Sequence, residues 1–378
     1  MIRLGDVATY INGFAFAPDD WSENGLPIIR IQDLTGNSYQ MNRYAGEYNP
    51  KYEVNRGDVL ISWSASLGVY VWQGEKALLN QHIFKVVFDK CEVDKSFYVH
   101  QVAAILEKAA SQAHGATMKH LTKPVFDALP FYLPDIPTQR RIADTLDKVS
   151  EGITLGKKMM DELDLMVKAK FVEMFGDMLL NSKHWSECTL ESLADIVSGI
   201  TKGRKTKDEN LIEVPYMAVS NVKDGHIDWR TVKTIMATTQ EINQYRLQSD
   251  DVLMTEGGDP DKVGRGAIIK NPPENCIHQN HIFRVRLNEK VILPTFFAEY
   301  LQHQKAKRYF LGCAKQTTGI ASINMRQLKA MPVLLPPIEL QEQFATFVSK
   351  IDKSRLTIQQ VLSKIELEQK VLMQKYFG

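Results

Sequence analysis

Four cations are gathered in one glycine-containing stretch, Gly199 to Lys207, which reads GITKGRKTK. These cations are Lys202, Arg204, Lys205 and Lys207. Glycine lets a backbone approach a ligand closely, and Lys and Arg side chains neutralise phosphate groups. The stretch therefore predicts a contact with the phosphates of a nucleic acid, and a solvated surface loop is the alternative interpretation.

Polar loops elsewhere in the chain offer further side chains of this kind. SQAHGATMKH begins at Ser111, AKQTTGIAS begins at Ala314, and the glycine-rich EGGDPDKVGRG begins at Glu256. Lysine, arginine, glutamine and threonine side chains suit phosphates or base edges. The same composition also describes ordinary surface connections. The nucleic-acid contacts that we expect from these loops are Lys119, Lys262, Arg265, Lys315, Gln316, Thr317 and Thr318.

Two stretches are partly similar to cofactor or nucleotide sites, and both are incomplete. NPPE, from Asn271 to Glu274, resembles the Asn-Pro-Pro-aromatic loop of adenine-N6 methyltransferases, but Glu replaces the aromatic residue that would stack on a flipped base. The sequence also lacks the F-x-G-x-G strand-turn for S-adenosylmethionine. Gly152 and Gly156-Lys157 miss the G-x-x-x-x-G-K spacing by one residue. We expect no cofactor or nucleotide site in this chain.

Histidines, acidic residues and cysteines do not form a catalytic or metal-binding set either. His82 and His281 recur within QHIF and NHIF, but no further ligand lies at metal spacing, which favours structural hydrogen bonding. Pro260-Asp261-Lys262 lacks the second acid of the common nuclease pattern. The four cysteines contain no C-x-x-C pair and are expected to be reduced thiols. We expect no catalytic residue and no metal site.

The composition is typical of a soluble globular protein with room for two or three domains. Of the 378 residues, 44% are hydrophobic and 24% are charged, and the net charge is only +1. The cations are unevenly placed, because His281 to Ile338 holds nine Lys/Arg against two Asp/Glu, whereas His82 to Ile136 holds six of each. No long apolar run and no basic-then-apolar leader are present. We expect a cytoplasmic protein without a membrane partner.

The sequence repeats itself along its whole length. LPDIPTQRRIADTLDKVS at 133–150 is matched 202 residues later by LPPIELQEQFATFVSKID at 335–352. LGDV from Leu4 is matched to LADI from Leu193, GDVLISW from Gly57 to DDVLMTE from Asp250, and NQHIFKV to QNHIFRV. Short β-rich runs with Gly, Asn and Asp turns precede a helical stretch in each half. Each half, about 190 residues long, is predicted to contain a mixed α/β (α+β) globular domain.

A long helix is predicted after each globular part. Pro137 and Glu339 stand where a helix can begin, and no proline follows before the end of either unit. Apolar residues recur in steps of four and three at 142–174 and, in the same register, at 344–376, which is a heptad pattern. This stripe is too narrow for a core helix, so the helices, each about 50 Å long, are predicted to pair as an antiparallel coiled coil. Packing of each helix on its own domain is the alternative.

This doubled order resembles the specificity subunit of type I restriction-modification systems. The resemblance rests on the entries from Leu133-Pro134 to Gln139 and from Leu335-Pro336 to Gln341, on the LGDV and SLADIVSGITKG openings, and on the GDVL strand start. It covers essentially the whole chain. It implies target recognition domains at 1–136 and 185–338, and conserved helical spacers at 137–176 and 339–378.

The resemblance implies a non-catalytic DNA-binding subunit. In that family each globular domain reads one half of a split site in double-stranded DNA, and the paired helices space the domains and dock two methyltransferase subunits. Restriction-translocase subunits complete the assembly, and S-adenosylmethionine and ATP are expected on the partners. Because the two domains differ between their shared landmarks, an asymmetric bipartite target is implied. The alternatives are a stand-alone adenine-N6 methyltransferase, which the missing cofactor loop disfavours, and a helical-hairpin scaffold that binds only proteins, which the basic loops disfavour.

Overall fold

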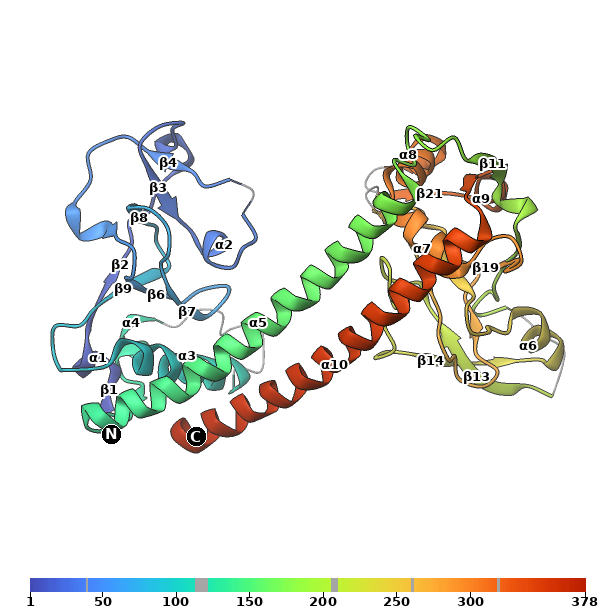
Figure 1. The fold of residues 1–378 in the computed structure, drawn as a ribbon. Helices are drawn as coiled ribbons and strands as arrows, with labels where there is room; N and C mark the ends of the chain where they lie inside the picture. Colours follow the sequence, from blue (N-terminus) through green and yellow to red (C-terminus); the bar gives the residue numbers. More distant parts are fainter. Residues whose placement is uncertain (39, 113–121, 205–209, 260–261, 318–319) are drawn as a thin grey trace. The chain divides into compact units, whose positions relative to one another are not determined.

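The computed structural model describes residues 1–38, 40–112, 122–204, 210–259, 262–317 and 320–378. They form two compact units (Figure 1). Unit 1 contains Met1–Lys158 and Gln359–Gly378, and unit 2 contains Met159–Ile358. Each unit therefore combines a globular α/β part with one segment from each of two long helices, α5 (Ile136–Phe175) and α10 (Ile338–Phe377).

Unit 1 is built on two four-stranded sheets. The first is antiparallel, in the order β2 (Thr9–Asn12), β9 (Ile83–Val87), β6 (Val59–Ser62), β7 (Gly68–Val71). The second has the order β4 (Arg43–Tyr44), β3 (Leu26–Ile29), β8 (Ala77–Leu79), β5 (Glu53–Val54), and β3 is parallel to β8. All residues of β6 and β8 are buried, as expected for near-continuous apolar runs in central strands.

Helices close the core of unit 1 on the side of the first sheet. Phe97 of α3 (Lys95–Gln112), Phe131 of β10 (Pro130–Phe131) and Leu146 of α5 pack with Phe84 of β9 in one buried cluster. β10 pairs with β1 (Ile2–Arg3). The shorter helical elements are α1 (Leu4–Val7), α2 (Ile31–Leu34), α4 (Lys123–Asp127) and 3-10 turns at Pro18–Asp20 and Pro50–Tyr52.

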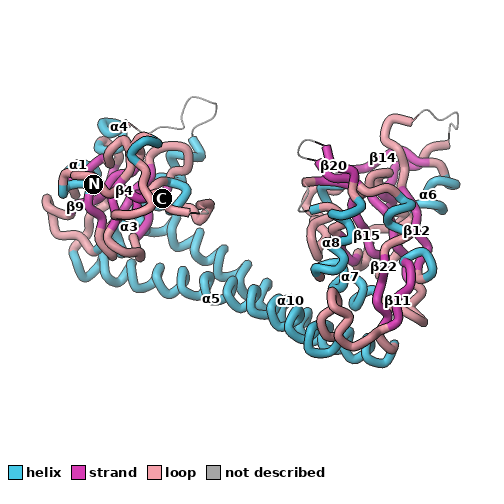
Figure 2. The backbone as a smooth tube through the Cα atoms, turned by 90° about the horizontal axis from the view of Figure 1, so that it is seen from above, coloured by secondary structure: helices cyan, strands magenta, loops and turns pink. Residues whose placement is uncertain are grey.

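Unit 2 repeats this topology. Its antiparallel sheet has the order β12 (Ala194–Ser198), β19 (Ile282–Leu287), β15 (Val252–Thr255), β17 (Gly266–Ile268). Its second sheet has the order β14 (Lys233–Ala237), β13 (Ile212–Met217), β18 (Ile277–His278), with β13 parallel to β18. β11 (Ser186–Thr189) pairs with β22 (Pro332–Leu335), as β1 does with β10. The predicted internal repeat and mixed α/β class are therefore confirmed, with one strand fewer in the second sheet of unit 2. Strands and helices occur in both units (Figure 2).

The remaining elements of unit 2 lie mainly in its second half. A three-stranded sheet contains β16 (Gly257–Gly258), β21 (Ile320–Ser322) and β20 (Lys315–Thr317). The helices are α6 (Thr239–Tyr245), α7 (Pro294–Gln302), α8 (Gln304–Cys313) and α9 (Met325–Lys329), with 3-10 turns at Leu190–Ser192 and Val219–Asn221. α7 packs on the first sheet through Phe296 and Phe297, both without exposed surface.

One landmark of the repeat is matched differently from the sequence prediction. Leu4 N donates to the Leu129 carbonyl at 2.9 Å, and the equivalent bond in unit 2 runs from Leu190 N to the Met331 carbonyl at 2.9 Å. Leu4 therefore corresponds to Leu190, and the match of LGDV to the segment from Leu193 was out of register by three residues. The LxD pattern is too short to fix the register without the strand pairing that follows it.

α5 and α10 run antiparallel within each unit. In unit 1, Gln369 Nε2 donates to Ser150 Oγ at 3.1 Å. In unit 2, Arg355 of α10 pairs with Asp164 of α5, and the rings of Phe171 and Phe344 lie 5.5 Å apart. Each helix has 40 residues, which at 1.5 Å per residue is about 60 Å and longer than predicted.

No helix in the described ranges combines the length and the apolar character that a membrane crossing requires.

Candidate nucleic-acid interface

One edge of the β12-β19-β15-β17 sheet gathers the loops that the sequence singled out in unit 2. β12 and β15 end at this edge, and β19 and β17 begin there, because neighbouring strands of the sheet are antiparallel. The loop with Lys202 and Arg204 follows β12, and the segment with Lys262 and Arg265 connects β15 to β17. Cation-bearing loops that are distant in sequence thus leave the sheet at the same end.

The small sheet brings a third predicted loop to this edge. β21 pairs with β16 on one side and with β20 on the other, so the 315–322 hairpin lies against the start of the glycine-rich segment. The approach is close at Gly257, where a Cβ would lie 3.0 Å from the Ala321 carbonyl oxygen. Lys315 is exposed at the start of β20. Two of the predicted loops, the glycine-rich segment and the segment with Lys315, are therefore neighbours.

Arg204 is engaged in an ion pair inside unit 2. Its guanidinium donates to both carboxylate oxygens of Glu241 on α6, and Nη2 also donates to the Met236 carbonyl at 3.1 Å. The hydrogen bonds from Arg204 lower the pKa of the Glu241 carboxyl. The pair fastens the end of the glycine-containing loop to α6. A phosphate contact from Arg204 stays a prediction, and holding this loop in place is a second role that the sequence did not reveal.

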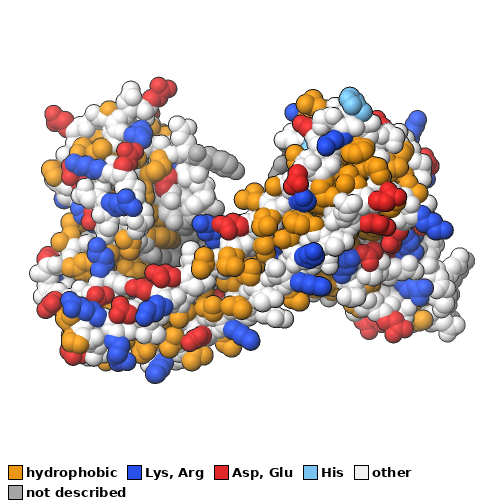
Figure 3. Space-filling view, viewed as in Figure 1, with side chains coloured by type: hydrophobic (Ala, Val, Ile, Leu, Met, Phe, Trp, Pro, Cys, Tyr) orange, Lys and Arg blue, Asp and Glu red, His pale blue; other side chains and the backbone are white. Residues whose placement is uncertain are grey.

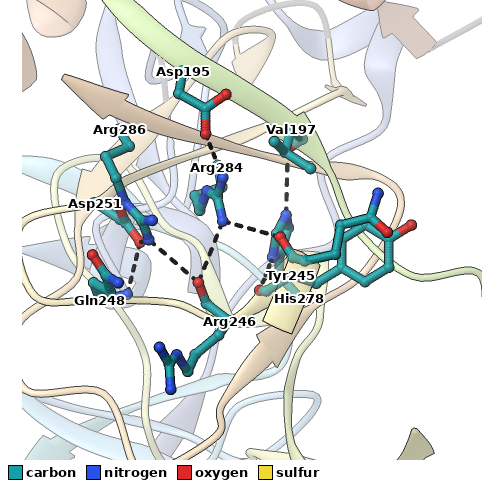
Figure 4. A network of polar contacts seen from close by, with 10 residues as sticks. Asp195, Val197, Tyr245, Arg246, Gln248, Asp251, His278, Arg284 and Arg286 are labelled. Atoms are coloured by element: carbon teal, nitrogen blue, oxygen red, sulfur yellow. Dashed lines mark hydrogen bonds and ion pairs between the residues drawn. The ribbon is translucent and has the colours of Figure 1, made fainter. Parts of the chain in front are cut away.

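Both ends of α6 are fixed to their surroundings. At its N-terminus, Thr238 and Glu241 form a capping box, in which each backbone N–H is bonded by the side chain of the other residue. At its C-terminus, Arg284 of β19 donates to the Arg246 carbonyl and to the Asp195 carboxylate at 2.6 Å (Figure 4). The sheet thus determines where Glu241, and with it Arg204, lies.

His278 belongs to the same buried network and stands where unit 1 has Leu79. Its ring nitrogens lie 3.1 Å from the Tyr245 carbonyl oxygen and 3.3 Å from that of Val197 (Figure 4). Burial lowers the pKa of His278 to about 4. The neutral imidazole carries one N–H and so donates to one of the two carbonyls. His278 is therefore a structural group between β12 and the end of α6.

Arg265 faces a small cavity lined by three cations and by Asp224, which pairs with Lys307 at 3.6 Å. The cavity has a volume of about 280 Å³, and its walls include Arg265 together with Lys307 and Arg308 of α8. Nε of Arg265 is buried without a hydrogen-bond partner among the described atoms. Lys307 and Arg308 were missed as individual residues, although both lie in the stretch 281–338 whose cation excess the sequence shows.

The other predicted residues have separate outcomes. Lys202 is exposed in the turn after β12, and Lys262 pairs with Asp259. Backbone atoms of Gln316 and Thr317 belong to β20. Lys119, Lys205, Lys207 and Thr318 lie outside the described residues, as do the side chains of Gln316 and Thr317. DNA contact by any of these side chains stays a prediction.

The matching edge of unit 1 is aromatic. Trp63 follows β6 and His82 precedes β9, and their rings lie 4.9 Å apart. Trp63 Nε1 donates to Asn12 Oδ1 at the end of β2, at 3.2 Å. Phe14, in the loop after β2, is 43% exposed. Sequence reasoning missed Trp63 and Phe14 because it looked for cations. The available signal was their place after the strands that match β15 and β12.

The stretches that were weighed as enzyme motifs have structural roles. Asn271, at the start of NPPE, has φ of 48° in the connection between β17 and β18, as a turn residue does. Gly152 and Gly156 lie inside α5. Within the described ranges no three His, Cys, Asp or Glu side chains are grouped so that they could hold a metal ion. All four cysteines are free thiols.

A family model described as the type I restriction modification DNA specificity domain matches residues 1–165 and 182–369. The type I restriction enzyme EcoBI specificity subunit of Escherichia coli is 23% identical over 413 residues, which cover 100% of this chain and 85% of that protein. The EcoKI specificity subunit of Escherichia coli (strain K12) is also 23% identical, with coverage of 99% and 88%.

Solved structures share the fold over the full length. The S subunit of a type I restriction-modification system from M. genitalium has a TM-score of 0.57 at 15% identity, covering 100% of this chain and 95% of that one. A chain from a structure on complex assembly and conformational transition of the type I R-M system has a TM-score of 0.54, also at 15% identity, with coverage of 100% and 96%.

Proposed function

Because this chain belongs to the family of type I restriction-modification DNA specificity proteins, we propose that it reads an asymmetric bipartite DNA sequence, one half with each unit. The observation that carries this proposal is the contrast between two topologically equivalent sheet edges. In unit 2 the edge bears Lys202, Arg204 and Arg265, and in unit 1 it bears Trp63 and Phe14. Equivalent positions with such different chemistry cannot make the same contacts with bases.

We expect two kinds of DNA contact at these edges: contacts that position the protein on the phosphate backbone, and contacts that read the bases. Lys202, Lys262, Lys315 and the α8 cations are suited to phosphates, whose contacts fix orientation and depend on salt. Phe14 offers an exposed ring, and Trp63 offers the part of its ring that is not stacked on Phe84. Aromatic surfaces of this kind contact bases or sugars rather than phosphates. We therefore expect the affinity of unit 2 for DNA to depend more steeply on salt than that of unit 1.

The paired helices supply the spacer and the docking surface in this proposal. Antiparallel contacts between α5 and α10 within each unit are consistent with a continuous coiled coil. Large apolar side chains on both helices are exposed and lie among charged ones (Figure 3), which is typical of a surface that another helix covers. They are Leu155, Met159, Leu165, Met166, Val172, Leu356, Val361, Leu367 and Val371.

The partners in the proposal are double-stranded DNA, two methyltransferase subunits and the restriction subunits. The chain itself supplies no catalytic group, and S-adenosylmethionine and ATP belong to those partners. If methylation instead arose in this chain alone, the purified chain would bind S-adenosylmethionine. Calorimetry with the cofactor therefore separates the proposal from a stand-alone methyltransferase.

The experiment that tests the proposal is selection of bound sequences from a random DNA pool by the chain assembled with its methyltransferase. We expect two unlike half-sites separated by a fixed gap. Combined substitution of Lys202 and Lys315 by Ala should weaken binding uniformly and reduce the salt slope by about one unit per lost phosphate contact. Substitution of Trp63 by Ala should relax only one half-site. A palindromic or single-block motif would contradict the proposal.

A further inference from the structure

The end of α5 in unit 2 is covered by the segment that follows it. This cover segment is Asp177–Trp185, which begins after Gly176 in the left-handed conformation, with φ of 77°. Asp177 Oδ1 accepts a hydrogen bond from Leu179 N at 2.7 Å, and Trp185 Nε1 donates to the Phe175 carbonyl at 2.8 Å. Met178 has no exposed surface and packs in the same cluster as Phe175.

The equivalent end of α10 in unit 1 borders a pocket. The pocket has a volume of about 510 Å³, and its walls come from α3, β10, the first turns of α5 and the last turn of α10. Phe377, the counterpart of Phe175, is partly exposed, whereas Phe175 is fully buried. The apolar lining consists mainly of Ala104, Ile105, Ala109, Leu129, Pro130 and Ile142.

The two places are equivalent by one match in sequence and two matched contacts. Phe377 stands 202 residues after Phe175 in the repeat. The β1–β10 ladder on the pocket wall corresponds to the β11–β22 ladder beside the cover segment. A matched hydrogen bond also stands at the start of the helix on the opposite wall. In unit 1 the Asp94 N–H donates to Gln139, and in unit 2 the Leu293 N–H donates to Gln341. The pocket is thus the place that Met178 and its neighbours occupy in the other unit.

Three positively charged side chains surround the apolar lining of the pocket. Lys108 of α3, Arg141 of α5 and Lys375 of α10 all line it. The cover segment in unit 2 carries Asp177 directly before its buried methionine. An apolar pocket with a cationic rim is therefore complementary to a segment that presents an acidic residue beside a large flexible apolar side chain.

We propose that this pocket of unit 1 is a docking site for a segment of a partner protein that has the chemistry of the cover segment, an acidic residue followed by a methionine or leucine anchor. The volume lies within the range of about 300–1,000 Å³ that is usual for ligand pockets. This site is separate from both sheet edges, so it concerns assembly with a protein and not the reading of DNA.

The probe for the test is a fluorescent synthetic peptide with the sequence of residues 176–187, GDMLLNSKHWSE. Fluorescence anisotropy with the full-length chain should show saturable binding with a dissociation constant between about 1 μM and 1 mM. Met178→Glu in the peptide removes the anchor and should weaken binding about 10- to 100-fold. Leu180→Glu is the matched control and should have little effect, because Leu180 is 76% exposed in unit 2.

Variants of the protein locate the binding site. Ile105→Glu places a charge on the pocket wall, and Ala104→Phe fills the pocket without a charge, and both should abolish binding while circular dichroism shows an intact fold. Val125→Glu, at a residue of unit 1 that is 52% exposed and outside the pocket, should bind as the parent chain does. The proposal is wrong if the parent peptide does not bind, if the Met178→Glu peptide binds equally, or if both pocket variants retain full affinity.

Discussion

At the scale of single residues, Gln139 and Gln341 explain why the chain repeats the same entry into a long helix. Each amide is buried and joins two backbone segments. Gln139 accepts from Asp94 N at 2.8 Å and donates to the Pro134 carbonyl at 2.8 Å. Gln341 makes the same two bonds in unit 2, with Leu293 and Pro336. The spacing from Leu-Pro to Gln is therefore set by a bridge between the helix and the globular part.

Replacement of Gln341 by Leu should destabilise unit 2. The substitution introduces an apolar side chain of similar size and leaves the Leu293 N–H and the Pro336 carbonyl without their partner. An unsatisfied buried group costs about 1–3 kcal/mol. Urea unfolding should show a loss of at least that size in the free energy of unfolding. Gln343→Leu, at an exposed position on the same helix, is the control, and an equal loss there would contradict the bridge.

His278 should make the stability of unit 2 depend on pH. Its pKa is lowered to about 4 in the folded chain, against about 6.5 when unfolded. Between these values the unfolded state binds more protons, so stability falls as pH falls from about 6.5 to 4 and is constant above. The slope contributed is at most about 1.4 kcal/mol per pH unit.

The pH dependence can be measured by urea unfolding at pH 7.5 and pH 4.5. His278→Leu, which introduces the residue that unit 1 has at this place, should reduce the difference in unfolding free energy between the two pH values. His226→Leu changes an exposed histidine of the same unit and serves as the control. If His278→Leu shows the same difference in unfolding free energy between the two pH values, other titratable groups cause that difference.

At the scale of elements, two glycines of α5 differ in their contacts with α10. A Cβ on Gly156 would lie 2.5 Å from Leu362 Cδ2, whereas a Cβ on Gly152 would lie 3.7 Å from Ile365 Cδ1, at ordinary contact distance. Gly152→Ala should therefore raise stability by up to about 1 kcal/mol, the helix propensity difference. Gly156→Leu should lower stability because the two helices must separate. Thermal unfolding followed by circular dichroism checks both, and equal effects would argue against close helix packing at Gly156.

The heptad pattern predicted the buried positions well in the first half of α5 and less well near its end. Ile142, Leu146 and Ile153 are buried as the pattern requires. Near the end of α5 the pattern selects Lys170 and Met174, yet Phe171 and Phe175 are the fully buried residues there. They pack against Phe296 of α7, with ring centroids 5.5 and 4.8 Å apart. The spacing of apolar residues reports which face of a helix is buried against one partner helix. It cannot show that another element, here α7, packs on the same helix.

The predicted interface shows the same limit. Loop composition selected segments that leave the same end of the unit 2 sheet, because cations and glycines are visible in sequence; their contact with DNA stays a prediction. It did not reveal that Arg204 pairs with Glu241, 37 residues away, nor that the equivalent edge of unit 1 is aromatic. Both facts follow from strand order, which brings together segments that share no local pattern.

At the scale of the whole molecule, the proposed spacer predicts a measurable change in the DNA target. One heptad inserted between Lys157 and Lys158 of α5, with another between Gln360 and Val361 of α10, preserves antiparallel pairing on both sides. The helices lengthen by about 10 Å, which is about three base pairs. Mapping of methylated sites should show unchanged half-sites and a wider gap, although DNA bending reduces the gain. An insertion in α5 alone is the control, and an unchanged gap in the double insertion would refute the spacer.

The discontinuity of unit 1 has a consequence for synthesis on the ribosome. Its two parts are separated by the 200 residues of unit 2, from Met159 to Ile358. At about 5–20 residues per second, the α5 segment of unit 1 waits about 10–40 s for its partner segment of α10. During that interval Ile153, which is 8% exposed in the folded unit, and its apolar neighbours on the helix face have no partner helix. All residues of the second unit are therefore synthesised before the first unit is complete. A chaperone that binds apolar helix faces could bind the exposed face of α5 during that interval.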